Sequence, residues 1–244
     1  MQLHIHENPE ALSKAVADWL VKYVGEVLQR QERFTIALSG GSTPQALYDL
    51  LAKSPYRESI AWEKMHVFWG DERYVPFSDA RNNARMAFDT LLQKVPIPAG
   101  QIHVMQTDVE PEASAAAYEK LLHTYFDANT TTFDLVLLGM GDDGHTLSLF
   151  PGTAVVHEEQ AWVKAYYLDA QAMYRLTLTA PVVNRAGCVV FLVTGSKKAG
   201  VFKAVLKGYL NGPYQPELYP SQRIQPGNGN LIWFTDKAAV AEID

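Results

Sequence analysis

The feature that most constrains the fold is an alternation of short apolar segments with longer amphipathic ones along the whole chain. The short segments are rich in β-branched and aromatic residues, which is typical of strands, and the longer ones repeat apolar residues at helical spacing. The expected strands are 34–39, 65–70, 133–139, 161–168, 174–179, 188–195 and 231–236, and the expected helices are 9–30, 43–51, 83–92, 112–126 and 197–210. This order predicts an α/β fold with a mainly parallel, doubly wound sheet flanked by helices.

We expect a single domain over residues 1–244, because 244 residues lie within the range of one α/β domain. Hydrophobic residues make up 48% of the chain, enough for a core that folds on its own. Pro, Gly and Asn gather at 95–100 and 211–230, but neither segment is a convincing linker. A strand-like segment follows the second one and needs a sheet to join, so 211–230 is interpreted as an ordered loop.

Charge and cysteine content exclude several classes of protein. The formal net charge of -6 argues against nucleic-acid binding, although a small anionic substrate stays compatible with a locally positive site. The single cysteine, Cys188, cannot form an internal disulfide or a cysteine-based zinc site, and its apolar surroundings predict a buried core position. We see no signal peptide and no apolar run of roughly 18 residues that could span a membrane. We expect a cytoplasmic protein, either a monomer or a small homo-oligomer.

Four Gly-rich turns follow four of the expected strands: "GGSTP", "GDER", "GMGDDGH" and "GSKKA". Ligands of open parallel sheets bind outside the carboxyl ends of the strands. If these strands are parallel, the four turns therefore meet at one edge of the sheet. The polar residues of the chain are concentrated where that geometry predicts a site.

Two of these turns have the composition of an anion site. Gly40 and Gly41 allow a close backbone approach, Thr43 can cap the following helix, and Pro44 suits its first position. Free N–H groups and the helix dipole at that end favour a phosphate. In "GSKKA", Lys197 and Lys198 stand at a helix start, where a bound phosphate would offset their charge. The alternatives are a capped turn without ligand and a solvated lysine pair; neither a Walker A loop nor a GxGxxG spacing is present.

The other two turns have residues suited to acid–base chemistry. "GDER" places three charges, Asp71, Glu72 and Arg73, directly after a strand, and Arg73 could meet an anion or a developing oxyanion. "GMGDDGH" contains His145, which titrates near neutral pH and can act first as a base and then as an acid. Adjacent Asp143 could orient it. A solvated surface turn is the alternative for both, and no HExxH or Cys cluster supports a metal.

Together these stretches resemble the family of the 6-phosphogluconolactonases and the glucosamine-6-phosphate isomerases/deaminases, in family order along most of the chain. The matching segments are "SGGSTP" (39–44), "GDERYVP" (70–76) with "NN" (82–83), "GMGDDGHTLSLFPG" (139–152), "RLTLT" (175–179), "VTGSKKA" (193–199) and "WFTDKAA" (233–239). The resemblance implies a Rossmann-like fold without metal or organic cofactor. It implies hydrolysis of the small molecule 6-phospho-D-glucono-1,5-lactone to 6-phosphogluconate, in the oxidative pentose phosphate pathway.

The resemblance also implies roles for individual residues. His145 acts as general base and then acid, Asp143 orients it, and Arg73 helps with negative charge. The remaining candidates bind the substrate, chiefly its phosphate: Gly40, Gly41, Ser42, Thr43, Asp71, Asn83, Arg175 and Lys198.

Two alternatives stay open at the level of the sequence. The deaminases resemble "GxGxDGHIAFNEP", with a glutamate before the proline, whereas Phe150 precedes Pro151 here, and "DER" replaces "DEY". A sugar-phosphate-sensing module would carry an added DNA-binding segment, but the α/β pattern starts within the first forty residues. One departure from the lactonase pattern is Asn82, which stands where Ser is usual and puts a local contact in doubt.

Overall fold

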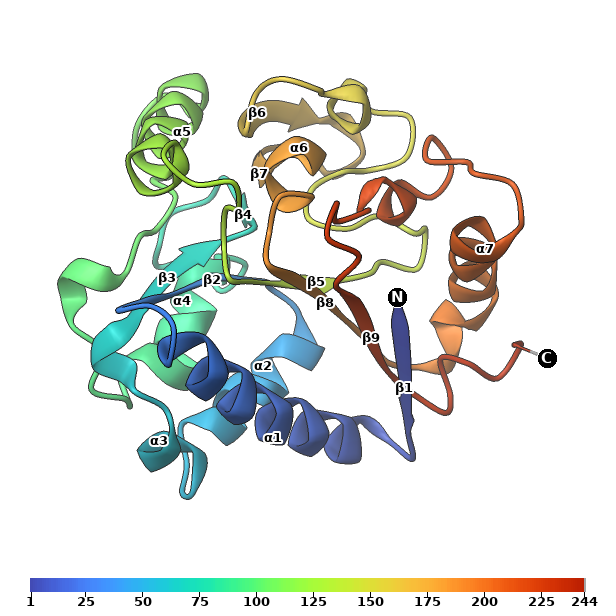
Figure 1. Ribbon diagram of the computed structural model, residues 1–244. Helices are drawn as coiled ribbons and strands as arrows, with labels where there is room; N and C mark the ends of the chain where they lie inside the picture. Colours follow the sequence, from blue (N-terminus) through green and yellow to red (C-terminus); the bar gives the residue numbers. More distant parts are fainter. Residues whose placement is uncertain (244) are drawn as a thin grey trace.

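A six-stranded parallel sheet forms the centre of the computed structural model, which describes residues 1–243 (Figure 1). Its strand order is β1-β9-β8-β5-β2-β3. The strands of this sheet are β1 (Gln2–His6), β2 (Phe34–Leu38), β3 (Met65–Trp69), β5 (Leu135–Gly139), β8 (Cys188–Val193) and β9 (Leu231–Asp236). The sheet is covered on both faces, which confirms the doubly wound α/β fold.

Helices pack against both faces of this sheet because its central strands are apolar on both sides. In β5, Leu135 and Leu137 belong to one buried cluster, and Val136 and Leu138 belong to the other. The helices of the first face are α1 (Pro9–Leu28), α2 (Ser42–Leu51), α3 (Tyr56–Ser59) and α4 (Asn83–Ala87) (Figure 1). Those of the second are α5 (Pro111–Phe126), α6 (Ala180–Val183) and α7 (Ala199–Leu210). Cys188 is buried in the first cluster, as expected.

A second, antiparallel sheet of order β4-β7-β6 lies beside the second face. It contains β4 (Asp71–Arg73), β6 (Val163–Leu168) and β7 (Met173–Leu178). Residues 71–73, read from the sequence as a turn, thus form a short strand. Its pairing sets Arg73 opposite Arg175, so the second sheet brings two of the candidate site residues together.

Several predicted element boundaries were wrong. A single α-helix was predicted over 83–92, but the α-helix ends at Ala87 and a π-helical turn follows over Phe88–Leu92. β1 was not predicted, because it is an edge strand exposed along most of its length and lacks an apolar run. The segment 211–230 is ordered around a 3₁₀ helix at Pro220–Arg223, in agreement with the prediction of an ordered loop.

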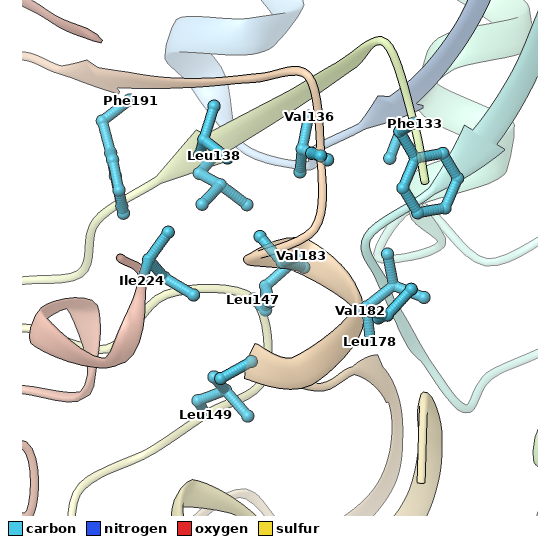
Figure 2. Packing of buried hydrophobic residues seen from close by; sticks show 14 of the residues in the cluster. Phe133, Val136, Leu138, Leu147, Leu149, Leu178, Val182, Val183, Phe191 and Ile224 are labelled. Carbon is cyan, nitrogen blue, oxygen red and sulfur yellow. The ribbon is translucent and has the colours of Figure 1, made fainter. Parts of the chain in front are cut away.

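The chain that follows the "GMGDDGH" turn packs into the buried cluster on the second face of the sheet. Figure 2 shows Leu147 and Leu149 packed among side chains of β5 and α6, including Leu138 and Val183. Leu147 adopts a φ of 55°, a left-handed conformation that is costly for a branched residue. The buried leucines therefore fix the turn that carries His145 at the rim of the sheet.

Candidate active site

A polar pocket lies at the carboxyl edge of the parallel sheet, where the four Gly-rich turns meet. The sequence-predicted residues that line it are Gly40, Gly41, Ser42, Thr43, Asp71, Arg73, Asn83, His145, Arg175 and Lys198. Asp143, the remaining candidate, lies directly behind His145. The parallel order of β2, β3, β5 and β8 explains this convergence, because parallel strands all end at the same edge.

The first turn presents an open helix N-terminus to the pocket. Helix α2 begins at Ser42, and the preceding Gly41 has a φ of 103°, which favours glycine. Thr43 does not cap the helix, contrary to the prediction: its Oγ1 lies 2.7 Å from Oγ1 of Thr194 at the end of β8. No side chain among residues 1–243 caps this end, so its N–H groups stay available to an anion.

Asn83 closes one side of this turn. Its Nδ2 donates to the carbonyl of Asp71 at 2.9 Å, and its Oδ1 occupies the space beside Gly40, where an added Cβ would lie 1.9 Å away. A side chain at position 40 would therefore displace the side chain of Asn83. The neighbouring Asn82 caps α4 by accepting from the N–H of Arg85 at 2.8 Å, a role that the Ser usual at this position can also fill.

Lys198 and Lys197 lie in different environments although they are adjacent. Lys198 lines the pocket and is half-buried, whereas Lys197 is exposed and outside the lining. Burial lowers the pKa of Lys198, and the nearby carboxylates of Asp142 and Asp236 partly offset this. An anion in the pocket would complete the compensation of its charge.

His145 is held from two sides. Its Nδ1 lies 2.6 Å from Oδ1 of Asp143, which also accepts the backbone N–H of His145 at 3.0 Å. Burial alone would raise the pKa of Asp143, but the hydrogen bonds from His145 outweigh it and lower the pKa. The ring of Phe150 stacks on the imidazole with centroids 4.0 Å apart. With Nδ1 bound to Asp143, Nε2 is the ring nitrogen left for proton transfer.

The two arginines of the site differ in what they can offer. Arg175 is 3% exposed, and its guanidinium donates to Asp71 Oδ2 at 3.0 Å and to Ser148 Oγ at 2.9 Å. Its donors are thus committed to a buried ion pair, which weakens the prediction that it binds the substrate anion. Arg73 donates through Nη1 to the carbonyl of Arg81 at 3.0 Å, while its buried Nε has no hydrogen-bond partner within residues 1–243. Arg73 is the more available cation.

Sequence reasoning missed three polar residues that support the site. Ser148 joins Asp71 and Arg175, and the sequence signal was a lone hydroxyl in the apolar run "TLSLF". Glu72 was noticed within "GDER", but no role was assigned to it. Ser221 donates to the carbonyl of Gly144 at 2.8 Å from a loop far along the chain, and no local signal marks it.

Two classes of feature are lacking in the part of the chain that the structure describes. Residues 1–243 contain no cluster of three or more His, Cys, Asp or Glu side chains placed to hold a metal. Within the same range, every helix is too short or too polar to cross a membrane.

The fold and the pocket are those of an α/β protein with a candidate active site at the carboxyl edge of a parallel sheet. A family model described as glucosamine-6-phosphate isomerases/6-phosphogluconolactonase matches residues 7–233. The chain belongs to this family.

Individual relatives resemble the chain over nearly its whole length. A 6-phosphogluconolactonase from Nostoc sp. is 41% identical and covers 96% of this chain and 94% of its own. A probable chloroplastic 6-phosphogluconolactonase from Oryza sativa subsp. indica is also 41% identical, over 98% of this chain and 75% of the relative. The solved 6-phosphogluconolactonase of Trypanosoma brucei superposes with a TM-score of 0.84 at 28% identity, covering 100% of this chain and 98% of that one.

Proposed function

We propose that the chain hydrolyses 6-phospho-D-glucono-1,5-lactone to 6-phospho-D-gluconate, which is the second step of the oxidative pentose phosphate pathway. The observation that carries the proposal is the His145–Asp143 pair, 2.6 Å apart, in the same pocket as an open helix N-terminus and a lysine. The names of the most similar relatives support the same substrate. An acid–base group and an anion site in one pocket suit a phosphorylated substrate that reacts at some distance from its phosphate.

In this proposal the phosphate occupies the N-terminus of α2. The N–H groups around Gly41 and Ser42 point towards it, Thr43 lies beside it, and Lys198 supplies a positive charge. Asp71 and Asn83 lie on the neighbouring wall of the pocket, where they can meet sugar hydroxyls. The lactone ring then extends towards His145.

The chemical step uses His145 twice. Its Nε2 takes a proton from water while the water oxygen bonds to C1 of the lactone, and the carbonyl becomes a tetrahedral oxyanion. Arg73 stabilises this negative charge. The intermediate collapses by breaking the bond between C1 and the ring oxygen, and His145 returns the proton to that oxygen. Asp143 stabilises the imidazolium that exists between the two transfers.

The residue that stands before Pro151 separates this reaction from deamination. Phe150 offers no carboxylate for ring opening, and its ring stacks on the imidazole instead. The tightly hydrogen-bonded acid–base pair also favours an enzyme over a sensing module. Both alternatives remain as outcomes of the experiment below.

The test follows the disappearance of the lactone. 6-Phosphogluconolactone is generated from glucose 6-phosphate by its dehydrogenase, and its conversion to 6-phosphogluconate is compared with the spontaneous rate. We expect His145→Ala to lower turnover by about 10²–10⁴-fold, the usual contribution of general acid–base catalysis.

His123→Ala is the matched control, because His123 also contacts a carboxylate, that of Asp127 at 2.5 Å, but lies on the surface of α5. It should retain wild-type turnover. If the wild type does not accelerate the reaction, lactone hydrolysis is ruled out, and glucosamine 6-phosphate with ammonia release becomes the next substrate to assay. Normal turnover by His145→Ala would instead refute the assignment of the base.

A further inference from the structure

Glu72 is a buried acid placed between two residues of the pocket, Asp71 and Arg73. It is 0% exposed. Its carboxylate accepts three backbone N–H groups: Oε1 accepts from Arg73 at 2.8 Å and from Asn83 at 2.7 Å, and Oε2 accepts from Ala84 at 2.8 Å. The side chain is enclosed by the protein and does not line the pocket.

These bonds connect the walls of the pocket to one another. Glu72 joins β4, which carries Arg73, to the first turn of α4, which carries Asn83. Asn83 in turn fills the space beside Gly40, at the proposed phosphate site. A shift in the carboxylate of Glu72 would therefore move the cation and one side of the anion turn together.

A buried charge of this kind is costly to keep. Burial raises the pKa of Glu72 to about 7, against the opposing effect of the three N–H groups, and Asp71 adds to the rise. The other ionisable groups around it are Arg73 on its own strand, Arg175 on the paired strand β7 and Tyr118 on α5. Glu72 forms no ion pair within residues 1–243, so backbone dipoles alone hold the charge.

We infer that Glu72 is a positioning residue for the proposed lactone hydrolysis: as a carboxylate it fixes Arg73 and the Asn83–Gly40 contact in the geometry that binds and polarises the substrate. This inference rests on the proposed function. Protonation turns one carboxylate oxygen into a hydroxyl, which is a weaker acceptor, so the bond from the backbone N–H to that oxygen is weakened. The active geometry accordingly belongs to the ionised form.

The Glu72→Gln variant imitates the protonated form, because its amide likewise has one strong acceptor oxygen in place of two. We expect the ratio of kcat/KM between the wild type and this variant to lie near one below pH 6. Above pH 7 the ratio should rise to about tenfold, the effect of one lost hydrogen bond to a charged group. The proposed acid–base chemistry of His145 is common to both proteins and cancels in the ratio.

Two further variants complete the experiment. Glu63→Gln, at an exposed glutamate, should give a ratio of one at every pH. Glu72→Asp keeps the charge and should restore the pH dependence of the wild type at a lower absolute rate. A ratio for Glu72→Gln that is constant over pH, whatever its size, would show a purely structural role and overturn the inference.

Titration of the wild type keeps the inference testable if Glu72→Gln does not fold. In protein with ¹³C-labelled glutamate carboxyls, one buried carboxyl should titrate near neutral pH. Binding of 6-phosphogluconate should lower that pKa, because a ligand that prefers the ionised form favours proton release. An unchanged pKa with bound 6-phosphogluconate would refute the positioning role. Absence of lactone turnover in the wild type, by contrast, would refute the proposed function.

Discussion

At the scale of single residues, two adjacent lysines differ in their environment: one is proposed to bind the phosphate, and the other is exposed to solvent. Lys198 lines the pocket and Lys197 does not. We expect Lys198→Ala to raise KM by about 10–100-fold with little change in kcat, because a charge-assisted hydrogen bond to a remote phosphate is lost. Steady-state kinetics of Lys197→Ala give the control, which should match the wild type. Equal effects of the two substitutions would contradict the phosphate assignment.

A contact between two side chains of the site could be predicted from the sequence where one local motif fixes its geometry. Asp143 and His145 are two positions apart in one tight turn, so their contact follows from the turn itself. The hydrogen bonds from the guanidinium of Arg175 to Asp71 and Ser148 could not be predicted, because these partners come from distant segments of the chain. Long-range hydrogen bonds of this kind leave no local pattern in a single sequence.

At the scale of elements, the loop over 211–230 clamps the turn that carries His145. Both the N–H and the hydroxyl of Ser221 donate to the carbonyl of Gly144, at 3.0 and 2.8 Å. Gly144 has a φ of 81°, and an added Cβ would lie 3.0 Å from Cδ1 of Tyr219 in the same loop. The loop therefore supports the turn that carries His145.

Removal of one of these two bonds should loosen the turn without opening the phosphate site. For Ser221→Ala we expect kcat to fall by about threefold to tenfold with KM nearly unchanged, and stability to fall by about 1 kcal/mol. Kinetics and urea unfolding measure the two effects. Ser59→Ala is a suitable comparison, because its hydroxyl makes a similar bond to the carbonyl of Pro55 on the exposed α3 and should leave kcat intact. A rise in KM for Ser221→Ala would contradict the clamp.

Helices and strands with a marked pattern of apolar residues could be predicted from the sequence, whereas those that depend on pairing with another strand could not. Strands β2, β5, β8 and β9 are largely apolar because helices cover both of their faces. In contrast, β4 is three polar residues that become a strand only through pairing with β7. The π-helical turn that follows α4 was not predicted, because the spacing of apolar residues over five positions cannot distinguish a π-helix from an α-helix.

At the scale of the whole molecule, the buried Glu72 and the half-buried His103 change the pH dependence of stability in opposite directions. The pKa of Glu72 is raised to about 7, so its contribution is full below its ordinary 4.5 and is lost as pH rises through 7. Burial, and then the neighbouring His66, lower the pKa of His103 from 6.5 to about 4. The contribution of His103 is full above 6.5 and is lost as pH falls towards 4.

Between pH 4.5 and 6.5 the effects of Glu72 and His103 on the free energy of unfolding therefore partly cancel. A variant that lacks one of these groups should show the pH dependence caused by the other. On acidification from pH 6.5 to 5, Glu72→Gln should lose about 2 kcal/mol more stability than the wild type, at about 1.4 kcal/mol per pH unit for one group. His103→Gln, which can still bond to the Tyr125 hydroxyl 2.9 Å from Nε2 in the wild type, should lose about 1 kcal/mol less, because His103 is only half-buried. Urea unfolding at both pH values measures these differences. Parallel pH dependences in all three proteins would mean that neither group retains its shifted pKa in the folded state, and the charge state inferred for Glu72 would then have to be abandoned as well.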